Sequence, residues 1–154
     1  MPLPIFSERL KDLMLIEGVS QHKLSSAANV QRKSVSNWLR GINYPRYDAL
    51  IRVADYFHIS TDYLIGINNT AESCFSRYPI EAIQTRLICK ITNFLTENNR
   101  TKYSLAKEIG IEQSTIERWF SVGAKPEVSI LIKLVKIMRE SLDELLGRTP
   151  DTRL

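Results

Sequence analysis

The chain has 154 residues, with 21 Lys or Arg against 17 Asp or Glu, and a formal net charge of +4. No apolar run approaches membrane-spanning length and no signal peptide is visible, which argues against a membrane or secreted protein. The mild positive charge permits nucleic-acid binding without requiring it. The two cysteines lack metal-like spacing, which favours reduced thiols in a cytoplasmic protein and no bound metal.

Apolar residues at helical spacing, beginning with Phe6 and ending with Met14, predict a first helix. Ser20 is a good N-cap for a second, and Pro45 suits the start of a fourth. No segment alternates with period 2, so we expect no strands and an all-α fold. The helical runs predicted in the first half of the chain are 6–14, 21–28, 32–40, 47–58 and 60–66.

The second half of the chain repeats the first at a constant distance of 81 positions, the separation of Trp38 and Trp119. A long unit that recurs once indicates a duplicated domain and not a solenoid. The same five runs are therefore predicted again, with Thr101 as an N-cap and a capping box at Ser141 and Glu144. The other matched pairs include Pro45/Pro126, Ser60/Ser141, Asp62/Asp143 and Gly66/Gly147.

Two small residues exchange between the repeats at equivalent positions. Gly18 pairs with Asn99, and Asn29 pairs with Gly110. Gly and Asn adopt a left-handed backbone most easily, so both positions are predicted to have positive φ. The second position is the turn between two short helices, the arrangement of a helix-turn-helix.

The order of caps and core positions resembles the XRE family of regulators, which have the Cro/cI-type repressor fold. The resemblance rests on Ser20-Gln21, on Val35-x-x-Trp38-x-x-Gly41 with Pro45, and on Ser60-x-Asp62-x-Leu64. It covers residues 6–66 and, more weakly, 87–147. It implies two tandem five-helix domains. The expected boundaries are 1–67 for the first domain, 68–81 for a linker, 82–148 for the second domain and 149–154 for a tail.

In a helix-turn-helix the second helix enters the major groove of DNA. Arg32 and Lys33 can donate to guanine and Asn37 can serve adenine, and the resemblance places these three at base-reading positions. Gln21 matches a phosphate-contacting position at a helix N-terminus. Further candidates for DNA contact are Gln31, Ser34, Ser36, Arg40, Asn43 and Arg46.

The two repeats differ in charge where DNA would approach. Residues 31–46 contain four basic and no acidic side chains, whereas residues 112–127 contain three acids and two bases. Acids facing phosphates oppose binding, so the second repeat is expected to dimerise, to pack on the first repeat or to assist DNA binding. A possible second DNA site comprises Lys102, Gln113, Ser114 and Arg118.

The family usually pairs a glutamate after the Trp with an arginine of the first helix. Here those positions are Leu39 and Met14, and in the second repeat Phe120 and Leu95. Replacing a buried ion pair by apolar residues together costs little, whereas losing one partner is strongly destabilising. We therefore expect Met14 to contact Leu39 and Leu95 to contact Phe120. The tryptophans are read as core residues.

The sequence is interpreted as a sequence-specific regulator, a repressor, that binds double-stranded DNA as a homodimer. Catalysis is not expected, because His22 and His58 have no histidine at the equivalent positions of the second repeat. No phosphate loop or nucleophile motif is present either. No cofactor, small-molecule effector or membrane partner is implied. The alternative is an antitoxin-like or anti-repressor module that binds another protein, which the acidic second repeat keeps open.

Overall fold

The first repeat is a bundle of five helices in the computed structural model, which describes residues 4–150. Its helices begin and end close to the predicted limits. None of the helices within 4–150 is long and apolar enough to cross a membrane. The five are α1 (Pro4–Glu17), α2 (Gln21–Ala28), α3 (Arg32–Leu39), α4 (Tyr47–Phe57) and α5 (Thr61–Leu64).

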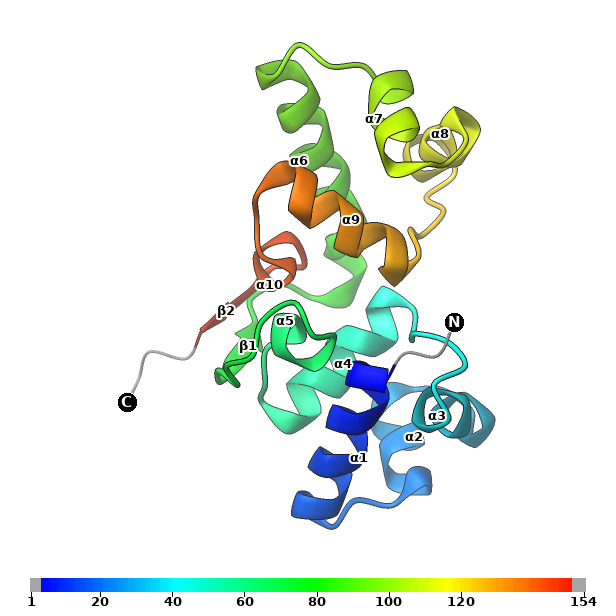
Figure 1. Ribbon diagram of the computed structural model, residues 1–154, viewed down its shortest axis with the longest axis vertical. Coiled ribbons are helices and arrows are strands. Elements are labelled where there is room, and N and C mark those ends of the chain that lie inside the picture. The colour runs from blue at the N-terminus through cyan, green and yellow to red at the C-terminus, as the bar shows by residue number, and fades with distance from the viewer. Residues whose placement is uncertain (1–3, 151–154) are drawn as a thin grey trace.

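The second repeat has the same five helices, as the resemblance implied. α2, α4 and α5 have counterparts that begin and end 81 positions later to the residue. Figure 1 shows the first repeat below and the second above, with α5 and its counterpart adjacent between them. The helices are α6 (Ile83–Glu97), α7 (Lys102–Ile109), α8 (Gln113–Ser121), α9 (Val128–Met138) and α10 (Leu142–Leu145).

The predicted N-caps and turns have the expected geometry, whereas of the capping box predicted at Ser141 and Glu144 only the Ser141 half forms. Ser20 Oγ accepts a hydrogen bond from the Lys23 amide at 3.1 Å, and Ser141 Oγ accepts from the Glu144 amide at 3.0 Å. A reciprocal capping box forms at Thr101 and Ser104, where the sequence predicted only an N-cap. The four predicted left-handed residues all have positive φ: Gly18 64°, Asn29 55°, Asn99 51° and Gly110 89°.

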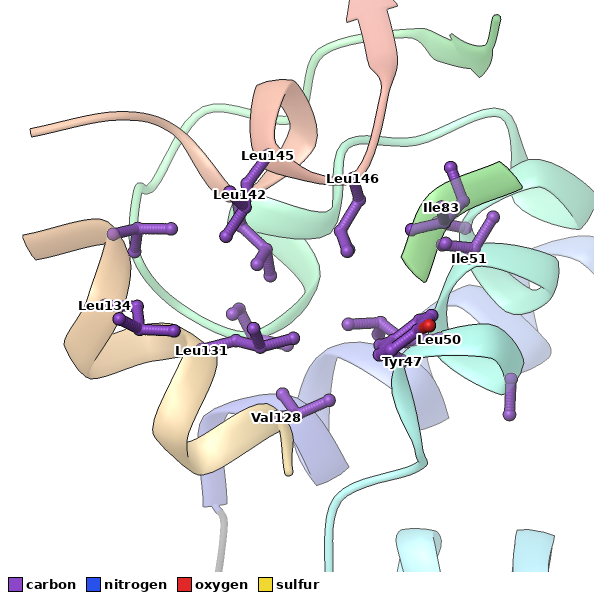
Figure 2. Packing of buried hydrophobic residues seen from close by; sticks show 14 of the residues in the cluster. Tyr47, Leu50, Ile51, Ile83, Val128, Leu131, Leu134, Leu142, Leu145 and Leu146 are labelled. Carbon is purple, nitrogen blue, oxygen red and sulfur yellow. The ribbon is translucent and has the colours of Figure 1, made fainter. Parts of the chain in front are cut away.

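One continuous hydrophobic core runs through both repeats. Within each repeat it includes the tryptophan of the third helix, and Trp38 and Trp119 are 3% and 2% exposed. Between the repeats it is formed by side chains from α4, α6, α9 and α10 (Figure 2). Small domains are marginal alone, and this shared core adds buried apolar area to each. The core residues labelled in Figure 2 are Tyr47, Leu50, Ile51, Ile83, Val128, Leu131, Leu134, Leu142, Leu145 and Leu146.

The expectation of no strands is wrong in one place. β1 (Cys74–Ser76) pairs antiparallel with β2 (Arg148–Pro150), and Phe75 lies opposite Thr149. Three-residue strands are too short to show an alternating pattern, and the pairing joins segments more than 70 positions apart. The predicted linker is thus partly ordered, and the predicted tail begins inside β2. Residues 1–3 of the first domain and 151–154 of the tail lie outside the described residues.

Between the repeats, the chain from 67 to 81 contains β1 and the start of a short 3₁₀ turn, η1 (Ile80–Ala82). Residues 67–73 are all exposed, whereas Cys74 is buried and Ser76 donates to Asp55 at 2.7 Å. Exposed backbone outside helices and strands is cleaved most readily. We predict that limited proteolysis cuts first within 67–73, as mass spectrometry of the fragments would show. A first cut inside α3 would contradict this division into repeats.

Candidate nucleic-acid interface

The turn between α2 and α3 sets the direction of α3. The left-handed Asn29 ends α2, and the Val30 amide then donates to Ser25 O at 3.0 Å. On α3, Val35 and Trp38 are buried against the core, at 0% and 3% exposure. Because a helix that buries one side presents the other to solvent, the first turn of α3 projects its basic side chains outward.

The predicted contact residues gather around this outward side of α3. Arg32 and Lys33 are exposed on its first turn, and Gln21 is exposed at the start of α2. Gln31 is the N-cap of α3 but makes no side-chain cap bond. The remaining candidates are the half-buried Ser34, Ser36 and Asn37 and the exposed Arg40, Asn43 and Arg46.

Four of these candidates line a cleft of about 270 Å³. Ser34 and Asn37 of α3 and Asn43 and Arg46 of the following loop all line it. Arg32 and Lys33 do not line the cleft. Sequence reasoning missed Arg52, which also lines the cleft and forms an ion pair with Asp48 at 3.7 Å. Arg52 lies on α4, outside the helix-turn-helix, so the motif gave no signal for it.

Two of the four residues of the possible second DNA site bond within their own repeat. Lys102 Nζ lies 3.4 Å from Glu117 Oε2 and 4.0 Å from the centre of the Phe120 ring. Gln113 donates to Glu117 Oε1 at 3.4 Å. Ser114 and Arg118 are exposed on α8. Glu117 therefore offsets part of the positive charge of Lys102.

The apolar substitutions for the family's ion pair occupy equivalent surface hollows. Met14 and Leu39 line one, and Leu95 and Phe120 line the other. Met14 and Leu95 are each 8% exposed, while Leu39 and Phe120 are partly buried against the core. None of the four is a free surface side chain, and direct contact within each pair stays a prediction.

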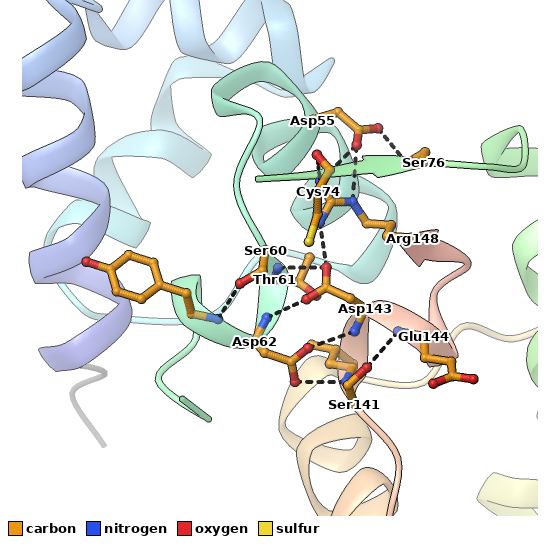
Figure 3. A network of polar contacts seen from close by, with 12 residues as sticks. Asp55, Ser60, Thr61, Asp62, Cys74, Ser76, Ser141, Asp143, Glu144 and Arg148 are labelled. Atoms are coloured by element: carbon orange, nitrogen blue, oxygen red, sulfur yellow. Dashed lines mark hydrogen bonds and ion pairs between the residues drawn. The ribbon is translucent and has the colours of Figure 1, made fainter. Parts of the chain in front are cut away.

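The two repeats are joined by a reciprocal polar contact that the sequence did not predict (Figure 3). Asp143 accepts hydrogen bonds from the amides of Thr61 and Asp62 at 2.8 and 3.1 Å. Asp62 accepts from the amides of Leu142 and Asp143 at 2.8 and 3.0 Å. Each aspartate thus satisfies two otherwise unpaired amides at the first turn of the other repeat's last helix.

A buried arginine distinguishes the two aspartates. Arg148, 2% exposed, donates to Asp143 at 2.5 Å, to Asp55 at 3.0 and 3.1 Å and to Cys74 O at 3.3 Å. Its counterpart in the first repeat is Ile67, so no equivalent cation serves Asp62. A buried cation with three acceptors is well compensated.

This asymmetry separates the pKa values of the pair. Burial, aided by the Asp143 side chain, raises the pKa of Asp62 from 3.8 to about 6. Burial also acts to raise the pKa of Asp143, but the hydrogen bond with Asp62, the Thr61 amide and the Arg148 charge hold it below its usual value.

A pH dependence of stability follows from Asp62. Its folded-state pKa lies above the unfolded value, so between about pH 4 and pH 6 the folded state binds a proton that the unfolded state does not. We predict that the urea midpoint of the chain rises as the pH falls from 7.5 to 5. In Asp62→Asn the part of this rise due to Asp62 should be lost. An identical rise in the variant would contradict the assignment.

Comparisons with known proteins agree with this geometry. The chain matches the helix-turn-helix family HTH_3 twice, over residues 10–64 and 91–145. It is 30% identical over 59 residues to the HTH-type transcriptional regulator ImmR of Bacillus subtilis strain 168, a match that covers 38% of this chain and 46% of that protein. The match thus spans about half the length of this relative. No solved structure matches the chain significantly.

Proposed function

Because the chain belongs to the XRE-type helix-turn-helix family, we propose that it is a sequence-specific DNA-binding transcriptional regulator with α3 as its reading helix. The observation that carries the proposal is the exposed basic first turn of α3 beside a polar cleft. The second repeat has no such turn. Arg32 and Lys33 are replaced there by Gln113 and Ser114.

The proposed contacts follow from the chemistry of the DNA surface. Arg32 and Lys33 would donate to guanine O6 and N7 in the major groove, and Asn37 would pair with adenine. Gln21, at the exposed start of α2, would contact a phosphate together with the helix amides. Arg46 would approach the DNA backbone or a groove from the loop before α4. The phosphate contacts set position and the base contacts set sequence.

We assign repression as the regulatory role, because occupation of a promoter site is sufficient to block transcription and requires no further activity of the protein. A transcription assay with the bound site placed within a promoter tests this assignment. Repression predicts that transcript falls as protein is added, and a rise in transcript would show activation.

The second candidate is a protein-binding module, and the surface of the second repeat favours it. Glu112 and Glu127 are exposed there, and Tyr103 and Val122 are 60% and 64% exposed. The window 112–127, with three acids against two bases, together with these exposed apolar side chains suits a protein partner better than DNA. This role would leave α3 without function, so we place it second.

Selection of bound sequences from random double-stranded DNA by the full chain tests the proposal. A reproducible motif that Arg32→Ala weakens is expected. Enrichment of no sequence, together with binding that does not differ between wild type and Arg32→Ala, would remove the DNA-binding proposal and favour the protein-binding module.

A further inference from the structure

The interface between the repeats has the symmetry of a dimer inside one chain. Each residue is exchanged for its equivalent by adding 81 in the first repeat and subtracting 81 in the second. This exchange converts the bond from Thr61 N to Asp143 into the bond from Leu142 N to Asp62, and the bond from Asp62 N to Asp143 into the bond from Asp143 N to Asp62. In a two-fold interface residue i contacts j while j contacts i, and this contact obeys that rule. The repeats are therefore related by an approximate two-fold axis that passes between α5 and α10.

The surface that forms this interface is fully used within the chain. Asp62 and Asp143 are 3% and 5% exposed, and the surrounding leucines of α5 and α10 are buried. A second copy of the chain therefore finds no free version of this surface. The homodimer expected from the sequence therefore cannot form through this surface.

Contacts outside the symmetric set hold the repeats in one arrangement. Tyr47 of the first repeat donates to Gln84 Oε1 at 2.6 Å. Gln84 Nε2 in turn donates to Ala124 O at 3.0 Å and Trp119 O at 3.3 Å in the second repeat. Arg148 adds its buried ion pair with Asp55. Together with the shared core, these contacts fix the position of α3 relative to α8.

The approximate two-fold places both helix-turn-helix units on one side of the molecule. Figure 1 shows α2–α3 and α7–α8 both towards the right, and β1–β2 on the opposite side. Between the two units, the loop before α4 and the start of α9 line a groove of about 460 Å³. In a repressor-like dimer this is the side that faces a single stretch of duplex.

The chemistry of this side is not symmetric. Across the groove, Arg46 of the first repeat has Glu127 as its counterpart. Arg32 corresponds to Gln113, and Asn37 corresponds to Arg118. The two identical half-sites of a palindromic DNA site would meet different side chains in the two repeats. The pairing of the repeats therefore gives no advantage in binding a palindromic site.

We propose that one chain acts as its own dimer and binds one asymmetric two-part DNA site. α3 reads the first part strongly and α8 contacts the second part, about one helical turn away. The inference rests on the proposed DNA-binding function and specifies the form of its site.

The test uses the wild-type full chain and the DNA recovered by selection. We expect a motif of two dissimilar parts and one chain per duplex by native mass spectrometry. Inserting 5 base pairs between the parts turns the second to the opposite side of the helix. This should weaken binding at least about tenfold, the order expected from one or two lost base contacts. The same insertion outside the site is the control.

A palindromic motif occupied by two chains would overturn the inference and leave the proposed function standing. So would an unchanged affinity after the central insertion, because α3 would then bind alone. Recovery of no motif would instead count against DNA binding itself. As a check on the interface, Asp62→Ala should make binding less sensitive to the central insertion, whereas Asp12→Ala, on the exposed side of α1, should keep wild-type sensitivity.

Discussion

Asp143→Ala is expected to lower the free energy of unfolding by about 3–5 kcal/mol, the cost of removing one partner from a buried ion pair. The substitution leaves Arg148 with Asp55 alone among its carboxylates and removes the acceptor of the Thr61 and Asp62 amides. Both losses occur in the same buried contact between the repeats, which places this change among the most damaging single substitutions outside the apolar core.

Urea unfolding measures the effect, with Asp12→Ala as the matched control. Asp12 is an exposed aspartate of α1, and its removal should change stability by no more than about 0.5 kcal/mol. Loss of a single cooperative transition in Asp143→Ala would also be informative, because it would show that the contact couples the two repeats. Equal midpoints for the two variants would show that the reciprocal contact contributes nothing to stability.

Arg32→Ala should cost about 1–3 kcal/mol of specific DNA binding and relax the preference at one position of the site. The side chain is exposed on the first turn of α3, so its loss leaves the fold intact. Gln21→Ala should weaken binding to all sequences evenly, because phosphate contacts carry no sequence information. Arg118→Ala should have a smaller effect than either, since Glu112 and Glu117 weaken the contact of α8 with DNA relative to that of α3.

Binding titrations at one fixed salt concentration, against the selected site and a scrambled duplex, separate these cases. A large loss in Arg118→Ala with no change in Arg32→Ala would show that the reading repeat and the supporting repeat are assigned in the wrong order. Silence of all three variants would remove the DNA-binding proposal. Circular dichroism of each variant confirms that the comparison is made between folded proteins.

Much of the local structure was determined by the sequence, because it depends on near neighbours. The N-caps at Ser20 and Thr101 and the left-handed turns at Asn29 and Gly110 follow from residue chemistry within one helical turn. Because the chain is duplicated, each of these features was predicted at two equivalent positions. The resemblance placed basic residues at the start of α3, and the structure shows Arg32 and Lys33 exposed there.

Two other left-handed residues could not be recognised from their residue type. His58 and Arg139, equivalent residues, both end their helices with positive φ, at 53° and 57°. Neither is Gly or Asn, so composition gave no signal. Their backbone is held by bonds of the following amides, Ile59 N to Ala54 O at 3.0 Å and Glu140 N to Val135 O at 3.1 Å.

Only the tertiary structure decided how the repeats face one another. Asp62 and Asp143 look like ordinary first-turn acids, which favour the N-terminus of their own helix. In the structure each one instead satisfies the N-terminus of the other repeat's helix. The β1–β2 pairing and the burial of Arg148 arise in the same way, from partners more than 70 positions away. Local sequence determines what a segment can form, whereas its partner across a long chain separation is settled only when the whole core packs.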